Sequence, residues 1–304
     1  MKATHNIFLV RPANFGFNAQ TAASNAFQNK PTAQAGQNKK ALKEFDAFAK
    51  KLKGAGINVF VFEDTASPVK PDAVFPNNWL STHSDGTLVL YPMCAPNRRA
   101  ERRKDILDRL KLNFKITNII DFSSFEKDNV FLEGTGSIIF DHTNKTAYAC
   151  LSPRTNKELF LRLAETLRYT PVCFYAHDKN GQEIYHTNVM MCVSENFALI
   201  CAESVSGKKE KERVLNSLLK SGHEVIEISF EQMNKFAGNA LGLKAKTGKN
   251  ILALSQSAYY CLTKEQRKAI EKYSQMLPLS VPVIENIGGG SARCMIAEIF
   301  LPVA

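Results

Sequence analysis

The stretch Ile287–Met295, IGGGSARCM, places a cysteine, Cys294, shortly after three consecutive glycines. A glycine run loses much conformational entropy when it is ordered, so it indicates either a flexible connector or backbone that lies close to another group. The residues that follow Cys294 form an apolar, β-prone run, which favours burial over disorder. The stretch therefore predicts an ordered and buried thiol beside closely packed backbone.

Polar side chains surround an aromatic residue in Pro71–Trp79, PDAVFPNNW, which ends at the single tryptophan of the chain. Asp72, Asn77 and Asn78 all lie near Phe75 in this stretch. An Asn-Asn pair often forms a turn, and the same residues can also line a polar pocket. The residues alone leave both interpretations open.

A carboxylate and a histidine occur in two further stretches. Glu133 follows an apolar pair and precedes Gly-Thr-Gly in Phe131–Ser137, FLEGTGS, where a solvated loop glutamate is the alternative. His186 and Asn188 lie in Ile184–Val193, IYHTNVMMCV, and would share one face of a strand because side chains alternate along a strand. A histidine packed in the core is the alternative there.

Taken together, these residue types are the parts of a thiol nucleophile. Cysteine attacks as the thiolate, and a neighbouring cation lowers the pKa of the thiol from about 8.5. A histidine such as His186 serves as acid and base, and a carboxylate such as Glu133 fixes its orientation. The three residues are far apart in the sequence, so the fold must bring His186 and Glu133 to Cys294.

The composition bounds the class of protein. The chain has 304 residues, of which 44% are apolar and 22% charged, as expected for a globular protein with a substantial core. No run approaches the ~18 apolar residues of a membrane-spanning helix. The apolar run Ile7–Val10 is too short for a signal peptide, so we expect a cytoplasmic protein without a membrane partner. The seven cysteines have no CxxC spacing, so neither a disulfide framework nor a zinc site is predicted.

A formal net charge of +10 raises the question of nucleic-acid binding. The basic residues, however, alternate with apolar and acidic ones at helical spacing in Lys39–Lys53, Arg98–Lys111 and Lys208–Lys220. Such a pattern is typical of solvated helix faces, so we do not expect a nucleic-acid partner. Attraction of an anionic small molecule is an equally good reason for the charge.

Strand-like and helical patterns alternate along the whole chain, without a linker that would divide it. The expected strands are Ile7–Val10, Val59–Phe62, Thr87–Tyr91, Ser137–Phe140, Ala147–Leu151, Val172–Tyr175, Val189–Val193, Phe197–Ala202, Glu224–Ile228, Ile251–Ala253, Val281–Ile284 and Cys294–Leu301. The expected helices are Lys40–Leu52, Arg98–Leu110, Asn156–Thr166, Lys208–Leu219, Phe230–Phe236 and Lys264–Gln275. Because the order repeats about five times, it predicts one cyclic, propeller-like α/β domain over residues 1–304.

Seven motifs in order resemble the guanidine-modifying pentein superfamily of arginine deiminases, dimethylargininases and amidinotransferases. They look closest to the citrulline-utilisation hydrolases, the CtlX-type branch. The motifs are Arg11–Asn18, Pro71–Trp79, Ala95–Arg99, Leu132–Ser137, Leu151–Asn156, His186–Met191 and Gly288–Met295. The resemblance implies a five-bladed pseudo-symmetric α/β propeller and catalytic roles for Cys294, His186 and Glu133, with no metal or organic cofactor.

The resemblance also implies how an amino-acid substrate is held and attacked. Cys294 would attack the planar carbon of a guanidine or ureide as part of a thiolate–imidazolium pair with His186. The glycines before Cys294 would let the planar group lie flat against the backbone. Arg154 occupies the place where relatives bind the substrate carboxylate. Arg98 is a weaker candidate for this role, because its neighbour Arg99 could serve instead. Asp72 matches an acidic residue near the substrate in relatives.

Two departures from the family bear on the substrate. Dimethylargininases have an acidic pair at Asn77-Asn78, and arginine deiminases have Asp at Asn188. Carboxylates suit a guanidinium, whereas an amide supplies an uncharged donor and acceptor and suits a ureido group. The asparagines therefore favour citrulline over arginine.

Several alternatives stay open at this level. An arginine or methylarginine hydrolase, or an amidinotransferase, is the main competitor. A non-catalytic pentein binding protein would share the fold, but it would have no reason to retain the cysteine, histidine and glutamate in their motifs. A homo-oligomer is compatible with the sequence.

Overall fold

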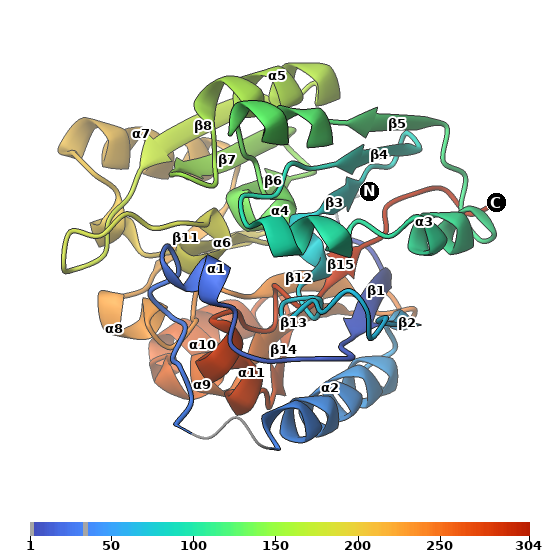
Figure 1. Ribbon diagram of the computed structural model, residues 1–304. Coiled ribbons are helices and arrows are strands. Elements are labelled where there is room, and N and C mark those ends of the chain that lie inside the picture. The colour runs from blue at the N-terminus through green and yellow to red at the C-terminus, as the bar shows by residue number, and fades with distance from the viewer. Residues whose placement is uncertain (1–2, 33–35) are drawn as a thin grey trace.

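The computed structural model describes residues 3–32 and 36–304, and its strands form five sheets of three strands each (Figure 1). The sheets are β15 (Ala297–Glu298), β1 (Asn6–Arg11) and β2 (Asn58–Glu63); β3 (Leu80–Thr82), β4 (Thr87–Leu90) and β5 (Asn118–Asp121); β6 (Ile138–Asp141), β7 (Thr146–Leu151) and β8 (Thr170–Tyr175); β9 (Met191–Val193), β10 (Phe197–Ile200) and β11 (Glu224–Glu227); β12 (Leu241–Lys244), β13 (Asn250–Ser255) and β14 (Gln275–Leu279). In every sheet the first two strands are antiparallel and the last two parallel. The repeated unit is a blade of the predicted five-bladed propeller.

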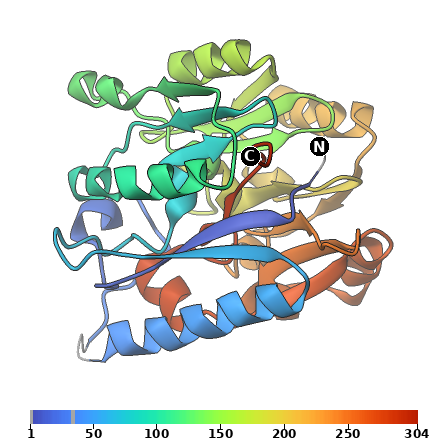
Figure 2. The same ribbon diagram turned by 90° about the vertical axis from the view of Figure 1, so that its right-hand side faces the viewer.

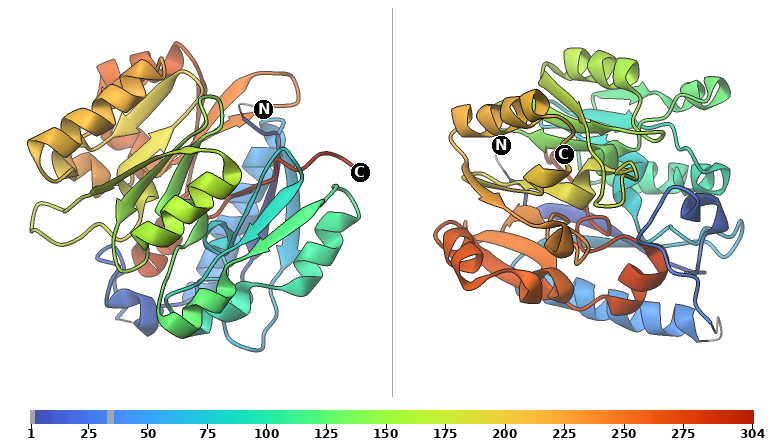
Figure 3. Two further views of the ribbon diagram at one scale, coloured as in Figure 1. Left: turned by 90° about the horizontal axis from the view of Figure 1, so that it is seen from above. Right: turned by 90° about the vertical axis from the view of Figure 1, so that its left-hand side faces the viewer.

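The parallel pair in each blade explains where the longer helices lie. Parallel neighbours need a crossover connection, usually a helix, whereas an antiparallel pair needs only a turn. The crossovers carry α2 (Gln37–Gly54), α3 (Lys104–Lys111), α5 (Lys157–Leu167), α7 (Lys208–Lys220), and α9 (Gln256–Cys261) with α10 (Lys264–Glu271). Seen from above, these helices lie on the outer side of the sheets (Figure 3).

The remaining helices are short and lie in loops. They are α1 (Ala19–Ala22), α4 (Gly134–Ser137), α6 (Thr187–Met190), α8 (Phe230–Met233) and α11 (Pro282–Gly288), with 3-10 turns η1 (Pro76–Asn78), η2 (Pro96–Glu101), η3 (Ser123–Asp128) and η4 (Ala202–Ser204). Three of them, η1, α4 and α6, end directly before the first strands of three blades, or one residue before. They therefore set how the chain enters those blades.

The two ends of the chain meet in one blade. Ile7 pairs with Glu298 and Phe8 with Ala297, so β15 completes the sheet that β1 begins. Just beyond this pair, Ile299 donates its backbone N–H to the Asn6 carbonyl at 2.9 Å. In Figure 2 the red C-terminal segment accordingly lies beside the dark blue β1. The ring of blades is closed by this pairing of the last strand with the first.

Most expected elements are confirmed, and the differences have local causes. The run Val281–Ile284 is wrong as a strand, because Pro282 begins helix α11 and occupies a first-turn position that suits proline. The strands expected at Val189–Val193 and Cys294–Leu301 are shorter than predicted, because α6 and a turn at Cys294 take their first residues. The pattern missed β3, β5, β12 and β14, which are short or interrupted by glycine or proline.

In the described part of the chain, no helix combines the length and the hydropathy that crossing a membrane requires.

The ring closure makes a prediction about stability. Ile299 is 1% exposed and follows the β15–β1 pair, so Ile299→Ala leaves a cavity at the closure and should reduce the free energy of unfolding by about 2–5 kcal/mol. Val303→Ala is the matched control, because that side chain is 68% exposed and its loss should cost no more than about 0.5 kcal/mol. Urea denaturation measures both, and equal losses would contradict the closure.

Candidate active site

The residues selected from the sequence enter the centre of the propeller from equivalent positions. Each lies in the segment that precedes the first strand of a blade: Asn78 before β3, Glu133 before β6, His186 before β9 and Cys294 before β15. Because these first strands face one another around the ring, the segments before them converge. The remaining blade, β12–β14, supplies a residue that the sequence analysis missed, Asn239, before β12.

Cys294 is 6% exposed, and its sulfur lies between two asparagine side chains. Asn188 and Asn239 each place Nδ2 at 3.3 Å from Sγ. The backbone N–H of Cys294 donates to the Ser291 carbonyl at 3.0 Å, so a tight turn presents the thiol. The predicted burial of this cysteine is confirmed, and its sulfur has two amide N–H donors.

His186 and Glu133 form a buried pair, with Nε2 and Oε2 2.8 Å apart. The other carboxylate oxygen of Glu133 accepts the backbone N–H of Cys94 at 2.9 Å, which fixes its orientation. Burial opposes ionisation of Glu133, but Arg154 and His186 outweigh it and hold the pKa of Glu133 well below its ordinary range. Glu133 is therefore ionised, and it can only accept the Nε2 proton of His186.

The charge of His186 differs from the expectation. Burial lowers the pKa of His186 to about 4, although the hydrogen bond that His186 donates to Glu133 acts in the opposite direction. At neutral pH the imidazole is neutral, with its proton on Nε2 and with Nδ1 free to accept one. Burial of His186 thus opposes the imidazolium that the expected thiolate–imidazolium pair requires.

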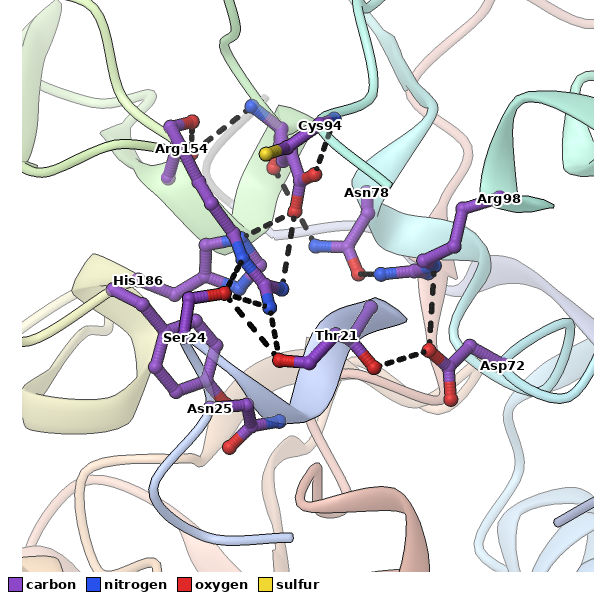
Figure 4. A network of polar contacts seen from close by, with 12 residues as sticks. Thr21, Ser24, Asn25, Asp72, Asn78, Cys94, Arg98, Arg154 and His186 are labelled. Carbon is purple, nitrogen blue, oxygen red and sulfur yellow. Dashed lines mark hydrogen bonds and ion pairs between the residues drawn. The ribbon is translucent and has the colours of Figure 1, made fainter. Parts of the chain in front are cut away.

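Arg98 rather than Arg99 lies at the site. Glu101 binds Nε and Nη2 of Arg98 at 2.9 Å each, and Nη1 donates to Asn78 Oδ1 at 3.0 Å. The Nε atom is 3.8 Å from Asp72 Oδ2, and this contact is one of the dashed lines in Figure 4. Arg99 instead turns away to the Met93 carbonyl.

Arg154 is buried and bound to the N-terminal part of the chain. Its guanidinium donates to the Thr21 carbonyl at 2.9 Å and to Ser24 Oγ at 2.6 Å, and it lies 3.6 Å from Glu133 (Figure 4). Residues 14–29 therefore cover the site, and we call them the covering segment. Thr21 Oγ1 also donates to Asp72 Oδ2 at 3.2 Å, so the segment contacts both charged ends of the site.

Several buried polar atoms in this centre have no hydrogen-bond partner among the residues that the structure describes. They are Asp72 Oδ1, both side-chain atoms of Asn77, and Asn188 Oδ1. The Nδ2 of Asn78 has only a long contact of 3.5 Å to the Glu133 carbonyl. Because buried polar groups are almost always satisfied, these atoms are the ones available to a ligand.

The glycine run has a different role from the one expected. A Cβ at Gly288 or Gly290 would lie 2.8–2.9 Å from the Phe75 ring, so an aromatic side chain occupies the space expected for a planar substrate group. Gly289 has φ +63°, and its carbonyl accepts the Tyr185 hydroxyl at 2.9 Å. The glycines let Phe75 pack against the loop that presents the thiol.

Sequence reasoning missed Asn239 and the covering segment for different reasons. Asn239 lies in a Gly-Asn-Ala stretch before a short strand, and its only signal was its place in the five-fold order of the elements. Thr21 and Ser24 lie just beyond the motif that ends at Asn18.

In residues 3–32 and 36–304, no three His, Cys, Asp or Glu side chains are grouped as metal ligands.

The family model described as N,N dimethylarginine dimethylhydrolase, eukaryotic, matches residues 11–301. The chain belongs to this hydrolase family. Together with its structural neighbours, the match places the chain in the guanidine-modifying pentein superfamily, as the resemblance predicted. No match is found among the curated proteins.

Solved structures with the same fold are similar over nearly the whole chain. One of them is the N-terminal domain of ArgZ, an arginine dihydrolase from the ornithine–ammonia cycle in cyanobacteria, solved with its substrate bound. Its TM-score is 0.75 at 15% identity, and the match covers 97% of this chain and 99% of the ArgZ domain. An apo structure of ArgZ has a TM-score of 0.76 at 15% identity, and the match covers 98% of this chain and 41% of the ArgZ chain. Dimethylarginine dimethylaminohydrolase, solved as an adduct with S-methyl-L-thiocitrulline, has a TM-score of 0.66 at 15% identity. The match covers 97% of this chain and 99% of that chain. The five-bladed pentein fold is thereby confirmed.

The packing around His186 gives a prediction. A Cβ on Gly136 would lie 2.2 Å from Asn78 Nδ2 and 2.8 Å from His186 Cε1, so Gly136→Ala must displace one of them. A shift of about 1 Å in such a group costs about 100-fold in rate, so the hydrolase activity should fall by about that factor.

Gly54→Ala is the matched control for this prediction. It lies at the end of α2 with no atom within 4 Å of the added carbon, so the rate should not change. Equal rates for the two variants would show that Gly136 does not position the site.

Proposed function

We propose that the protein hydrolyses a C–N bond of a ureido amino acid, with citrulline as the preferred substrate and Cys294 as the nucleophile. The observation that carries the proposal is the placement of a buried sulfur against two amide donors in a centre that also holds the His186–Glu133 pair. Such a sulfur can be deprotonated and can attack a bound planar carbon.

The chemistry follows from the protonation states. Nδ1 of the neutral His186 takes the thiol proton, and the ionised Glu133 stabilises the imidazolium that forms. Sulfur bonds to the ureido carbon, one C–N bond breaks, and His186 returns the proton to the departing nitrogen. Water, activated by His186, then cleaves the C–S bond and releases a carbamic acid. The carbamic acid loses carbon dioxide as its remaining C–N bond breaks. The balance is citrulline plus water to ornithine, ammonia and carbon dioxide.

The two ends of an amino acid fit charged groups of opposite sign. The unpartnered oxygen of Asp72 can accept from the α-ammonium group. The guanidinium of Arg154 is bound by Thr21 and Ser24 of the covering segment, and a substrate carboxylate would replace these weaker neutral acceptors. Substrate entry thus requires the covering segment to release Arg154.

The asparagines fit a neutral head group. A ureido oxygen needs a donor, which Asn78 Nδ2 can supply, and a ureido N–H needs an acceptor, which Asn188 Oδ1 can supply. Asn77 offers a further donor and acceptor. Glu133 is already paired with Arg154 and His186, so a guanidinium would have to be buried beside amides rather than a free carboxylate.

A guanidino amino acid such as arginine is the second candidate. It is favoured by the structural neighbours, which are named as an arginine dihydrolase and a dimethylarginine dimethylaminohydrolase. Membership of the citrulline-utilisation branch stays a prediction, as does the cytoplasmic location. We expect no metal or organic cofactor, because each step above uses only side chains and water.

The direct test is turnover of citrulline and arginine in separate incubations. We expect equal amounts of ornithine and ammonia from citrulline at a rate at least tenfold above that from arginine, and none with Cys294→Ala or His186→Ala. Cys173→Ala, at a half-buried thiol in β8, should retain full activity. Preference for arginine would contradict the substrate, and turnover by Cys294→Ala would contradict the nucleophile.

The charge of the head-group site can be tested separately. Asn78→Asp replaces the amide donor by a carboxylate, which repels a ureido oxygen and pairs with a guanidinium. The ratio of kcat/KM for citrulline to that for arginine should fall at least tenfold, about 1.4 kcal/mol. Asn250→Asp, in β13, should leave the ratio unchanged. An unchanged ratio in Asn78→Asp would mean that this asparagine does not face the head group.

A further inference from the structure

Asn239 belongs to none of the motifs that the sequence resemblance identified, yet its side chain is 1% exposed and lies in the centre of the site. Its amide orientation is fixed by two backbone groups. Oδ1 accepts the N–H of Arg293 at 3.1 Å, and Nδ2 donates to the carbonyl of Asn188 at 2.9 Å. An inverted amide would face a donor with a donor and an acceptor with an acceptor.

This orientation leaves the second N–H of Asn239 for the sulfur. Nδ2 is 3.3 Å from Cys294 Sγ, whereas Oδ1 is 3.6 Å away. Asn188 Nδ2, at 3.3 Å, is the other donor. A neutral thiol can donate its proton to Asn239 Oδ1, but at 3.6 Å this is the longer contact. A thiolate accepts both amide N–H groups, and a hydrogen bond to a charged acceptor is stronger than one to a neutral thiol. The arrangement is therefore selective for the charged form of the sulfur.

The basic side chains of the site contact groups other than the Cys294 sulfur. His186 is neutral at rest, and Arg154 is bound by Glu133 and the covering segment. Arg98 is held by Glu101. The hydroxyl of Tyr185 donates to the Gly289 carbonyl, so it is not directed at the sulfur. Among the described groups, the amides of Asn188 and Asn239 are the hydrogen-bond donors that contact Sγ.

We propose that Asn239 is a further catalytic residue, whose amide N–H stabilises the Cys294 thiolate together with that of Asn188. Its Oδ1 also fixes the loop that presents the thiol, through the N–H of Arg293. The proposal rests on Cys294 being the nucleophile of the proposed function, and it is independent of which substrate is hydrolysed.

The test is the pH dependence of Cys294 alkylation by iodoacetamide in the full-length protein, followed by mass spectrometry of the peptide that contains Cys294. Loss of one charge-assisted hydrogen bond in Asn239→Ala should raise the alkylation midpoint by about one pH unit. At a pH below both midpoints, this corresponds to about a tenfold smaller thiolate fraction, and kcat/KM should fall in proportion.

Asn239→Asp is a second variant that removes the donor to sulfur without leaving a cavity, because aspartate has nearly the same volume as asparagine. The introduced carboxylate can still accept the Arg293 N–H, but it lacks the donors to the sulfur and to the Asn188 carbonyl, and it repels the thiolate. The midpoint should therefore rise at least as far as in Asn239→Ala. Asn250→Ala, an asparagine of β13 in the same blade, is the matched control and should keep the wild-type midpoint.

The outcomes separate this inference from the proposed function. Unchanged midpoints in both Asn239 variants would overturn it, even if kcat falls, because the residue would then be only structural. Raised midpoints support it, and alkylation does not depend on turnover. A wild-type protein that hydrolyses neither citrulline nor arginine would refute the proposed function while leaving the midpoint result valid.

Discussion

The pairing of β15 with β1 is the constraint on which the rest of the structure depends. It joins residues from opposite ends of the chain into one sheet and closes the ring of five blades. Cys294 lies directly before β15, so the same pairing fixes where the thiol enters the centre. His186 and Glu133 enter from two other blades. The site therefore exists only in the closed ring, although each of its residues lies on a short local turn.

Burial governs the chemistry of the centre. Ionised side chains removed from water must be paired, and Glu133, Arg154, Arg98 and Asp72 are all held by partners of opposite charge or by polar groups. The same burial keeps His186 neutral, since its pKa is lowered to about 4. The histidine is thus available as a base. The negative charge that forms on sulfur must be met by neutral donors, and the asparagine amides lie where such donors are needed.

The repeated order of elements predicted the propeller, and the glycine-flanked motif predicted the buried thiol. The residues of the candidate site were selected through the family resemblance, and their roles stay predictions. The sequence could not predict contacts that join distant segments. The partners of Arg154 are Thr21 and Ser24, more than a hundred residues away, and the glycines turned out to pack against Phe75. Asn239 was missed because no local pattern marks it, and the neutrality of His186 depends on burial, which spacing alone does not fix.

The central claim is that a covalent bond forms between Cys294 and the ureido carbon of citrulline. Rapid acid quenching during turnover, followed by mass spectrometry of the peptides, tests it most directly. We expect a transient mass increase on the peptide that contains Cys294, equal to a carbamoyl group if ornithine leaves first, or to a carbonyl-linked ornithine if ammonia leaves first. Citrulline turnover without any adduct on that peptide, or with an adduct on Cys94 instead, would contradict the account.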